Sequence, residues 1–225
     1  NMLQPFAYTG KKAHFLNKQH VVVVRKDARV LIAKIYHPLW QAWIVVAHAP
    51  QSGIPEDQRQ AWWASLTEQF MKFVKDEEVY VLIDANAEPG PTDGIHVGPR
   101  QTKTSKSTKF LREFLETWKL ALPCTFSCHS GSQATWTTPD GRSQHCIDHV
   151  CLPLSRIGDC KFSRIVEELD LGNGHLDHTA TAVEVAWHQV VQLPLRRSQT
   201  ASIHRESIDV AMQASLAQYD VPPWE

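Results

Sequence analysis

The chain has 225 residues, of which 43% are hydrophobic and 21% are charged, and its formal net charge is −1. These values are ordinary for a folded globular protein and exclude a polycationic chain, so a contact with a polyanion has to come from a local basic patch. No apolar run approaches the length that crosses a bilayer, and no signal peptide opens the chain, so we expect no membrane partner.

The first part of the chain predicts a β meander, a helix and one further strand. β-Branched and aromatic runs between short polar turns are typical of strands, and they cover Val21–Arg25, Val30–Tyr36 and Trp43–Ala47. Pro55–Val74 carries large apolar residues at helical spacing and predicts an amphipathic helix. Val79–Ile83 is an unbroken apolar run, which is typical of a strand buried on both faces.

The middle of the chain predicts a loop and a second helix before strands return. Residues 87–105 are rich in Gly, Pro and Thr, and Thr108–Trp118 places its apolar residues on one helical face. Short strands are then expected at Cys124–Ser127, Ala134–Thr137, His145–Leu152, Phe162–Glu168 and Thr179–Trp187. Strands interrupted by two helices predict an α+β fold, most simply two sheets packed face to face with helices outside.

The periodic pattern stops near Leu193. We therefore expect one domain over residues 1–190, followed by a linker over residues 191–225 that contains a short helix at His204–Gln218.

Asp84 directly follows the buried strand, and Asn86 lies two residues further on. If the strand persists through this point, the two side chains point the same way. A carboxylate at the end of a buried strand needs a partner, because its burial is otherwise costly. The alternative is an ordinary turn, since this run is full of turn-forming residues.

Asp148 is the one carboxylate on its face of the predicted strand, which it shares with Cys146, Val150 and Leu152. Such a group requires a hydrogen-bonding imidazole or a cation, or, in the alternative interpretation, an internal ion pair or a backbone amide to cap.

Asp177 and His178 stand in a turn that enters the last predicted strand, so one can face a metal while the other faces a substrate. Asp148 and His178 then suggest a carboxylate–imidazole pair, in which the carboxylate fixes the tautomer of the ring. A surface turn is the alternative for Asp177 and His178. By position alone, His48 is expected to be structural and Trp136 to lie in the core.

Two further groups of residues bear on ligands. The segment between Asp93 and Glu113 contains cations and no acid, which indicates either a surface that tracks phosphates or an ordinary solvated loop; the cations are Arg100, Lys103, Lys106, Lys109 and Arg112. The five cysteines are odd in number and lack CxxC spacing, which favours free thiols in a reducing compartment. The Cys124-x3-Cys128-His129 spacing does not predict a zinc site.

Five segments, taken in order, resemble the endonuclease/exonuclease/phosphatase (DNase I-like) superfamily, and most closely the endonuclease domain of non-LTR retrotransposons. They are Val46–Pro50, Leu82–Asn86, Thr135–Thr137, Cys146–Val150 and Leu176–His178. The resemblance implies a four-layer α/β sandwich, with two packed and mostly antiparallel sheets flanked by helices. It also implies a phosphodiesterase that uses Mg²⁺ or Mn²⁺.

The resemblance implies a role for each matching residue. Asp84 would orient or deprotonate the attacking water, and Asn86 would hold the site and the phosphate. Asp148 would orient His178, which would contact the scissile phosphate as a base or as a charge stabiliser. Asp177 would lie at or near the metal, whose task is to neutralise the charge that grows on the phosphate and on the leaving oxygen.

His48 matches a phosphate-contacting position that is Tyr in some members of the superfamily. Members usually open with a strand that bears an Asn and then a Glu that is the main metal ligand. No such strand and no Glu precede Val21. We therefore expect the sequence to be truncated at its N-terminus, to lack its first strands and to bind metal poorly. Ile83, Ala85 and Leu176 also replace the usual Gly, aromatic residue and Ser.

The leading hypothesis is a magnesium-dependent endonuclease domain that nicks DNA in the nucleus, with a reverse-transcriptase domain downstream in the full-length protein. One alternative keeps the fold but makes the substrate a small phosphoester, such as an inositol phosphate or sphingomyelin. The other is a catalytically degenerate domain that binds nucleic acid or a partner.

Overall fold

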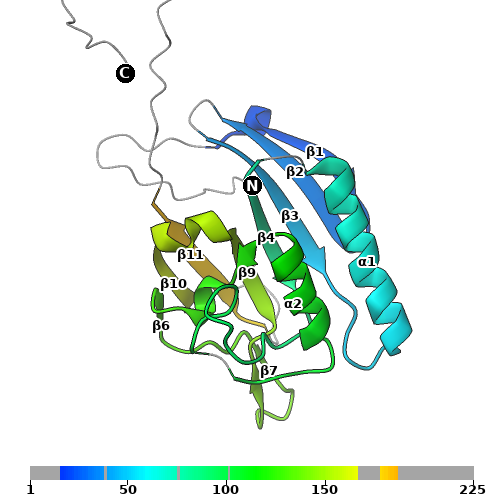
Figure 1. Ribbon diagram of the computed structural model, residues 1–225, viewed down its shortest axis with the longest axis vertical. Helices are drawn as coiled ribbons and strands as arrows, with labels where there is room; N and C mark the ends of the chain where they lie inside the picture. Colours follow the sequence, from blue (N-terminus) through cyan, green and yellow to red (C-terminus); the bar gives the residue numbers. More distant parts are fainter. Residues whose placement is uncertain (1–15, 38–39, 75–76, 101, 167–177, 187–225) are drawn as a thin grey trace, which may run out of the picture. The chain divides into compact units, whose positions relative to one another are not determined.

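In the computed structural model the described residues are 16–37, 40–74, 77–100, 102–166 and 178–186, and they form an α+β sandwich (Figure 1). The linker and helix expected over residues 191–225 lie outside the described residues, as does Asp177. No helix of the described part is both long enough and apolar enough to cross a membrane.

A six-stranded sheet forms the centre of the structure, with the strand order β1-β2-β3-β4-β9-β5. Its strands are β1 (Val21–Lys26), β2 (Val30–His37), β3 (Trp40–His48), β4 (Val79–Asp84), β9 (Asp148–Pro153) and β5 (Leu120–Ala121). Neighbouring strands are antiparallel except β3 and β4, which are parallel. The parallel pair follows from the long crossover between them, which contains helix α1 (Glu56–Phe73).

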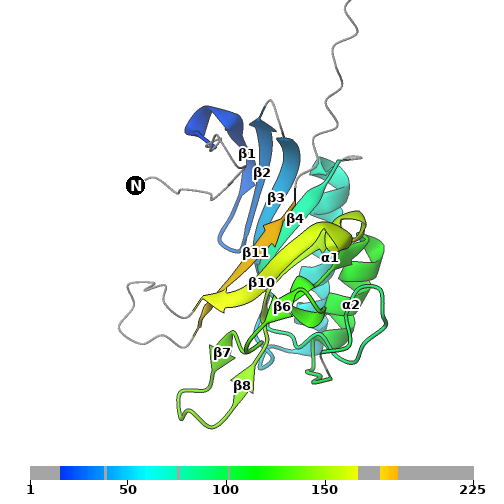
Figure 2. The same cartoon turned by 90° about the vertical axis from the view of Figure 1, so that its left-hand side faces the viewer.

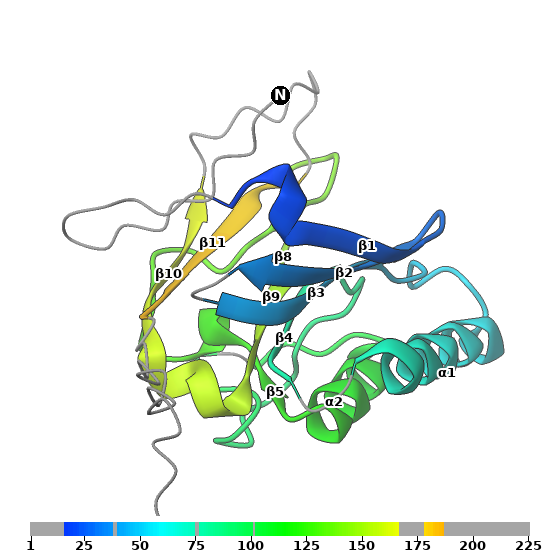
Figure 3. The same cartoon turned by 90° about the horizontal axis from the view of Figure 1, so that it is seen from above.

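Helices α1 and α2 (Thr108–Thr117) cover one face of this sheet (Figure 3). Phe70 of α1 is fully buried, and its ring centroid lies 5.1 Å from that of Phe114 of α2 and 4.9 Å from that of Trp118. Trp63 packs against Phe114 in the same layer, at 5.5 Å. The large apolar residues at helical spacing therefore do form the helix-side core, as the sequence predicts.

A three-stranded sheet with the order β11-β10-β6 lies against the opposite face (Figure 2). It contains β6 (His129–Ser130), β10 (Cys160–Val166) and β11 (Ala180–Val185), and β10 pairs antiparallel with β11 and parallel with β6. Ala42, Tyr80, Leu152 and Cys160 are buried in a second apolar cluster between the sheets. The expected α+β fold with two packed, mostly antiparallel sheets is confirmed.

The prediction of a strand at Cys124–Ser127 is wrong, because Pro123–Thr125 forms a short 3-10 helix, η2. Pro123 at its start has no backbone N–H to give to a strand ladder. The hydroxyl of Thr125 donates to the carbonyl oxygen of Leu122 at 2.7 Å and accepts from the Gly98 amide at 2.7 Å, so side-chain bonds replace a ladder.

The strand expected at His145–Leu152 is two strands with a break at Cys146 and Ile147. One is β8 (Gln144–His145), which pairs with β7 (Trp136–Thr137) in a hairpin, and the other is β9. The Thr135 hydroxyl oxygen accepts from the backbone amides of Ile147 at 3.0 Å and Asp148 at 2.9 Å, which holds the break.

The break corrects one prediction about side-chain direction. Cys146 belongs to the core on the helix side of the sheet, whereas Val150 and Leu152 belong to the cluster between the sheets. Cys146 therefore does not share the face of Asp148. The other predicted strands and helices agree with the structure to within a few residues. The sequence did not predict the short elements β5, β6, η1 (Lys18–His20) and η3 (Leu154–Asp159).

We expect Phe70→Ala to destabilise the domain by about 3–5 kcal/mol, because it removes a ring that is buried between the two helices and the sheet. Met71→Ala is the matched control: Met71 is the next residue of α1, it is 66% exposed, and its loss should change the free energy of unfolding by about 0.5 kcal/mol or less. Urea unfolding measures both values. Equal effects of the two substitutions would contradict the assigned helix face.

Candidate active site at the sheet edge

The ends of three neighbouring strands bring polar side chains together at one end of the large sheet. In the strand register, His48 of β3 lies opposite Asp84 of β4, and Asp84 lies opposite Asp148 of β9. Alternate residues of a strand share a face, and the residues two positions further into each strand, on the same face, are Val46, Leu82 and Val150. The sheet therefore presents two carboxylates and an imidazole side by side above an apolar floor.

His178 joins them from the segment that leads into the other sheet, two residues before β11. Its Nδ1 lies 2.9 Å from Oδ2 of Asp148. Because an ionised carboxylate only accepts, Nδ1 carries the proton, and the other ring nitrogen, Nε2, presents a lone pair. His178 also forms a backbone bridge with Trp136, which fixes its position beside the hairpin. The structure thus brings together the carboxylate and imidazole that the sequence suggests as a pair.

The surroundings of Asp84 disfavour the ionised form of its carboxyl group. Burial raises the pKa of its carboxyl group, and the nearby Asp148 carboxylate raises it further. One oxygen of each carboxylate lies within 4.8 Å of the other, and two unit charges at that distance repel by about 3.5 kcal/mol at an effective dielectric constant near 20. His48 lies on the other side of Asp84, with Nε2 3.4 Å from Oδ2.

Asn86 holds the turn that follows β4. Its backbone φ is +45°, a left-handed conformation that Asn tolerates, and its amide N–H donates to Oδ1 of Asp84 at 3.0 Å. Its side-chain Nδ2 donates to the carbonyl oxygen of Ala49 at 3.0 Å, which ties the end of β3 to the end of β4. The structure places Asn86 as a residue that positions the site, next to Asp84.

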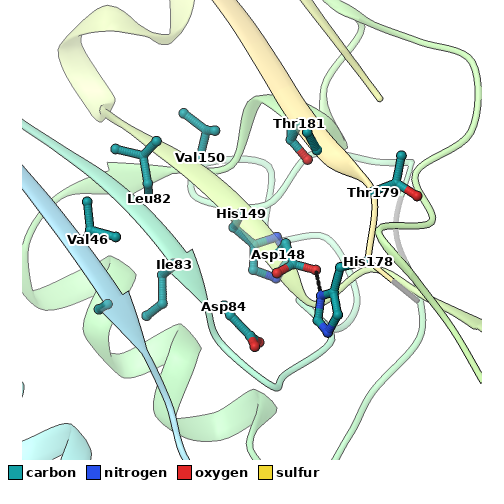
Figure 4. A pocket seen from close by; sticks show the side chains of 12 residues that line it. Val46, Leu82, Ile83, Asp84, Asp148, His149, Val150, His178, Thr179 and Thr181 are labelled. Carbon is teal, nitrogen blue, oxygen red and sulfur yellow. Dashed lines mark hydrogen bonds and ion pairs between the residues drawn. The ribbon is translucent and has the colours of Figure 1, made fainter. Parts of the chain in front are cut away.

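Asp84, Asp148 and His178 line an open cleft of about 330 Å³, and their side chains converge there (Figure 4). Thr179 and Thr181 form part of the opposite wall. The sequence also predicts His48 and Asn86 as site residues. Both contact Asp84, His48 through its imidazole and Asn86 through its backbone amide.

The two converging carboxylates are suitable ligands for a magnesium ion. One oxygen each of Asp84 and Asp148 and one ring nitrogen of His178 lie within 4.8 Å of one another. Mg²⁺ in proteins is commonly held by one or two carboxylates, with waters and substrate phosphates as its other ligands. A divalent cation would also remove the repulsion between the two carboxylates. Asp177, the sequence-predicted metal ligand, lies outside the described residues.

The residues predicted to contact nucleic acid lie on the loop before α2 and on the first turn of α2. Most of their side chains bond to other groups of the protein. Arg100 donates to backbone carbonyl oxygens of residues 129 and 131, and Lys103 donates to the carbonyl oxygen of Gln144 in β8 at 2.9 Å. Lys109 pairs with a glutamate of α1, and Lys106 is exposed. Arg112 pairs with Asp93 at 2.8 Å. Their contact with nucleic acid stays a prediction.

The structure adds one pair that the sequence did not indicate. Glu88 is only 2% exposed, and its Oε1 lies 3.1 Å from Nδ1 of His145. The His145 ring packs on Trp136 at 5.4 Å between centroids, and Trp136 in turn lies 6.4 Å from the His178 ring. Trp136 is therefore half-buried beside the cleft instead of lying in the core, and Glu88, in a loop rich in turn formers, gave no signal.

No protein-family model and no curated protein matches the chain. Solved structures do match. The endonuclease domain of TRAS1, a telomere-specific non-LTR retrotransposon, superposes with a TM-score of 0.55 over 83% of this chain and 80% of that domain, at 13% identity. A 3'-5' exonuclease from Neisseria meningitidis gives 0.55 over 74% and 71%, at 18% identity. An AP endonuclease from Archaeoglobus fulgidus gives 0.50 over 70% and 65%, at 13% identity.

At these identities the likeness shows the fold. The chain has the DNase I-like fold that the sequence resemblance implies.

We expect Asp84→Asn to stabilise the metal-free protein at neutral pH. The raised pKa means that ionised Asp84 opposes folding: the penalty is absent below the ordinary aspartic acid pKa and grows as the pH rises through the folded-state value. The gain of the variant over the original protein should therefore vanish in acid. Urea unfolding in the presence of a chelator, at neutral and acid pH, measures the difference.

Asp27→Asn is the control, and its expected effect on the free energy of unfolding has the opposite sign. Bonds from the Arg29 backbone amide and from the Arg25 side chain hold the pKa of Asp27 below its usual value, so this substitution should destabilise at neutral pH. An Asp84→Asn protein that is less stable than the original at neutral pH would contradict the assigned electrostatics.

Proposed function

We propose that this protein is a divalent-metal-dependent phosphodiesterase that cleaves a strand of DNA. The observation that carries the proposal is the convergence of Asp84, Asp148 and His178 in one open cleft. The solved structures of the same fold named above include an exonuclease and two endonucleases. Mg²⁺ or Mn²⁺ is the proposed cofactor, and when bound it would neutralise the charge that develops on the phosphate and on the leaving oxygen.

The geometry supports a general-base role for His178. Its Nδ1–H bond to Asp148 fixes the ring and leaves the Nε2 lone pair available for the proton of the attacking water. Asp148 would stabilise the imidazolium that forms. Asp148 is therefore a positioning residue for His178 through Oδ2, and its other oxygen would help to hold the cation.

Asp84 would hold the cation together with Asp148 and orient the attacking water toward the phosphate. Asn86 fixes Asp84 through its backbone amide, and its side chain keeps the two strand ends together. The His48 side chain is 51% exposed and adjoins Asp84, so it can reach a phosphate oxygen of a bound strand. Asp177 is the further candidate for the cation.

The shape of the cleft favours a polymer over a small phosphoester. Sites for small molecules usually enclose most of the ligand, whereas this cleft is open and its floor includes Val46 and Leu82, which are 44% and 41% exposed. Trp136, at the side of the cleft, offers a ring on which a base can stack.

The specific form of the proposal is a retrotransposon-type endonuclease that acts in the nucleus and has a reverse-transcriptase domain downstream.

A catalytically degenerate domain that binds nucleic acid or a partner is the second candidate. The observation that favours it is that the described residues contribute only two carboxylates to the cleft. A calorimetric titration of the full-length protein with Mg²⁺ separates the candidates: the proposed enzyme binds Mg²⁺ and loses this binding in the Asp84→Asn, Asp148→Asn double variant. No heat of binding would support the degenerate domain.

We expect His178→Ala in the full-length protein to reduce nicking of supercoiled plasmid by about 100-fold or more, because the base is lost. Removal of divalent ions with a chelator should stop nicking, and restored Mg²⁺ should recover it. His20→Ala is the control, since His20 lies beside β1 at the opposite edge of the sheet and pairs with His37. Undiminished nicking by His178→Ala would remove the mechanism.

The same proteins assayed for phosphate release from an inositol phosphate, and for hydrolysis of sphingomyelin, test the substrate class. Nicking without turnover of either small phosphoester is the expected result. Turnover of a small phosphoester without nicking would replace DNA with that substrate.

A further inference from the structure

A second group of three metal-binding side chains lies in the core behind the cleft. Cys124, Cys146 and His149 are buried, with 4%, 3% and 2% of their surfaces exposed. They come from η2, from the break between β8 and β9, and from β9. One ligand atom from each lies within 4.8 Å of the other two, and the sulfur atoms of Cys124 and Cys146 are 3.9 Å and 4.0 Å from Nδ1 of His149.

The His149 ring is held in the tautomer that a metal requires. Its Nε2 lies 3.0 Å from the carbonyl oxygen of Ala87. A carbonyl oxygen only accepts, so Nε2 carries the proton and Nδ1 points its lone pair at the two sulfur atoms. Metal-binding histidines usually donate their other ring N–H to a carbonyl oxygen or a carboxylate in this way.

The spacing is close to that of a tetrahedral zinc site. Zn–S bonds of about 2.3 Å and Zn–N bonds of about 2.0–2.1 Å imply S···N separations of about 3.6 Å in tetrahedral geometry. The observed 3.9 Å and 4.0 Å exceed this by a few tenths of an ångström. Small rotations of the two cysteine side chains would therefore complete the geometry without movement of the backbone.

Charge balance selects the ion. Two thiolates and one neutral imidazole carry a charge of −2, which Zn²⁺ cancels, and a neutral complex suits a buried apolar site. A monovalent copper ion would leave a net negative charge in the core, and magnesium prefers oxygen ligands. Two cysteines and one histidine, with a fourth position taken by another donor, form a known zinc ligand set.

Hydrogen bonding of uncharged thiols is the alternative explanation of the same geometry. Nδ1 accepts from one thiol, and the other thiol can donate to the first sulfur atom. Cys151 provides the contrast: it is fully buried on the same strand, and it belongs to the apolar core and to no such cluster. The convergence of two sulfur atoms on one imidazole nitrogen is therefore more than the burial of small apolar side chains.

We propose that Cys124, Cys146 and His149 bind a zinc ion in the core behind the cleft. His149 directly precedes Val150 and follows Asp148, and Ala87, which anchors the ring, directly follows Asn86. A bound ion would tie η2 and the break before β9 to β9 itself and, through the Ala87 carbonyl, to the turn after β4. The expectation from spacing considered Cys124 with Cys128, and not with Cys146 and His149.

The test is a zinc titration of the reduced full-length protein after removal of metals, against a chromophoric chelator. One equivalent is expected to bind, and it should raise the midpoint of thermal unfolding. Co²⁺ in place of Zn²⁺ should give thiolate-to-cobalt charge-transfer absorption, which reports sulfur ligands in the unmutated protein. The absence of both stoichiometric zinc binding and this absorption would overturn the proposal.

Variants locate the site. Cys124→Ala and Cys146→Ser should each weaken zinc binding by at least about tenfold, whereas Cys151→Ala, which creates a comparable core cavity, should retain it. The Asp84→Asn, Asp148→Asn double variant should also retain it, which separates this site from the cleft. Equal zinc affinity of the Cys146→Ser and Cys151→Ala proteins would contradict the assigned ligands, and the cobalt spectrum decides the matter if a variant fails to fold.

Discussion

Asp84 and Asp148 face each other across β4 and β9, and this pair of like charges is the constraint on which the rest of the site depends. Two carboxylates so close together are both ionised at neutral pH only if positive charge is brought between them. The fold places the imidazoles of His178 and His48 on either side of the pair, and the open cleft gives a divalent cation access to the centre. The arrangement is therefore suited to holding a cation and a phosphate.

The same sheet presents two groups of potential metal ligands, because successive residues of a strand point to opposite faces. On the face toward β11, strand ends carry the carboxylates and the apolar floor of the cleft. On the face toward α1 and α2, Cys146 and His149 meet Cys124 in a buried cluster. Asp148 and His149 are neighbours in sequence but belong to opposite faces, so a metal bound behind the sheet would stiffen the strand that presents Asp148.

The sequence predicted those parts of the structure that depend on local pattern. Apolar runs located β1 to β4 and both helices, and the isolated carboxylate of Asp148 correctly called for the imidazole of His178. The break before β9 could not be predicted, because its acceptor is the hydroxyl of Thr135, far from it in sequence. The Glu88–His145 pair and the contact of Cys124 with His149 also depend on segments that are separate in sequence, which spacing does not reveal.

The most direct test of the central claim is the titration of the Asp84 carboxyl group, followed by carbon NMR of protein labelled at aspartate. Without divalent ions, we expect its pKa to lie above the usual aspartic acid value because of burial and of the Asp148 carboxylate. Saturating Mg²⁺ should lower this pKa, since the cation favours the ionised form. An Asp84 pKa that does not respond to Mg²⁺ would contradict a cation site between the two carboxylates.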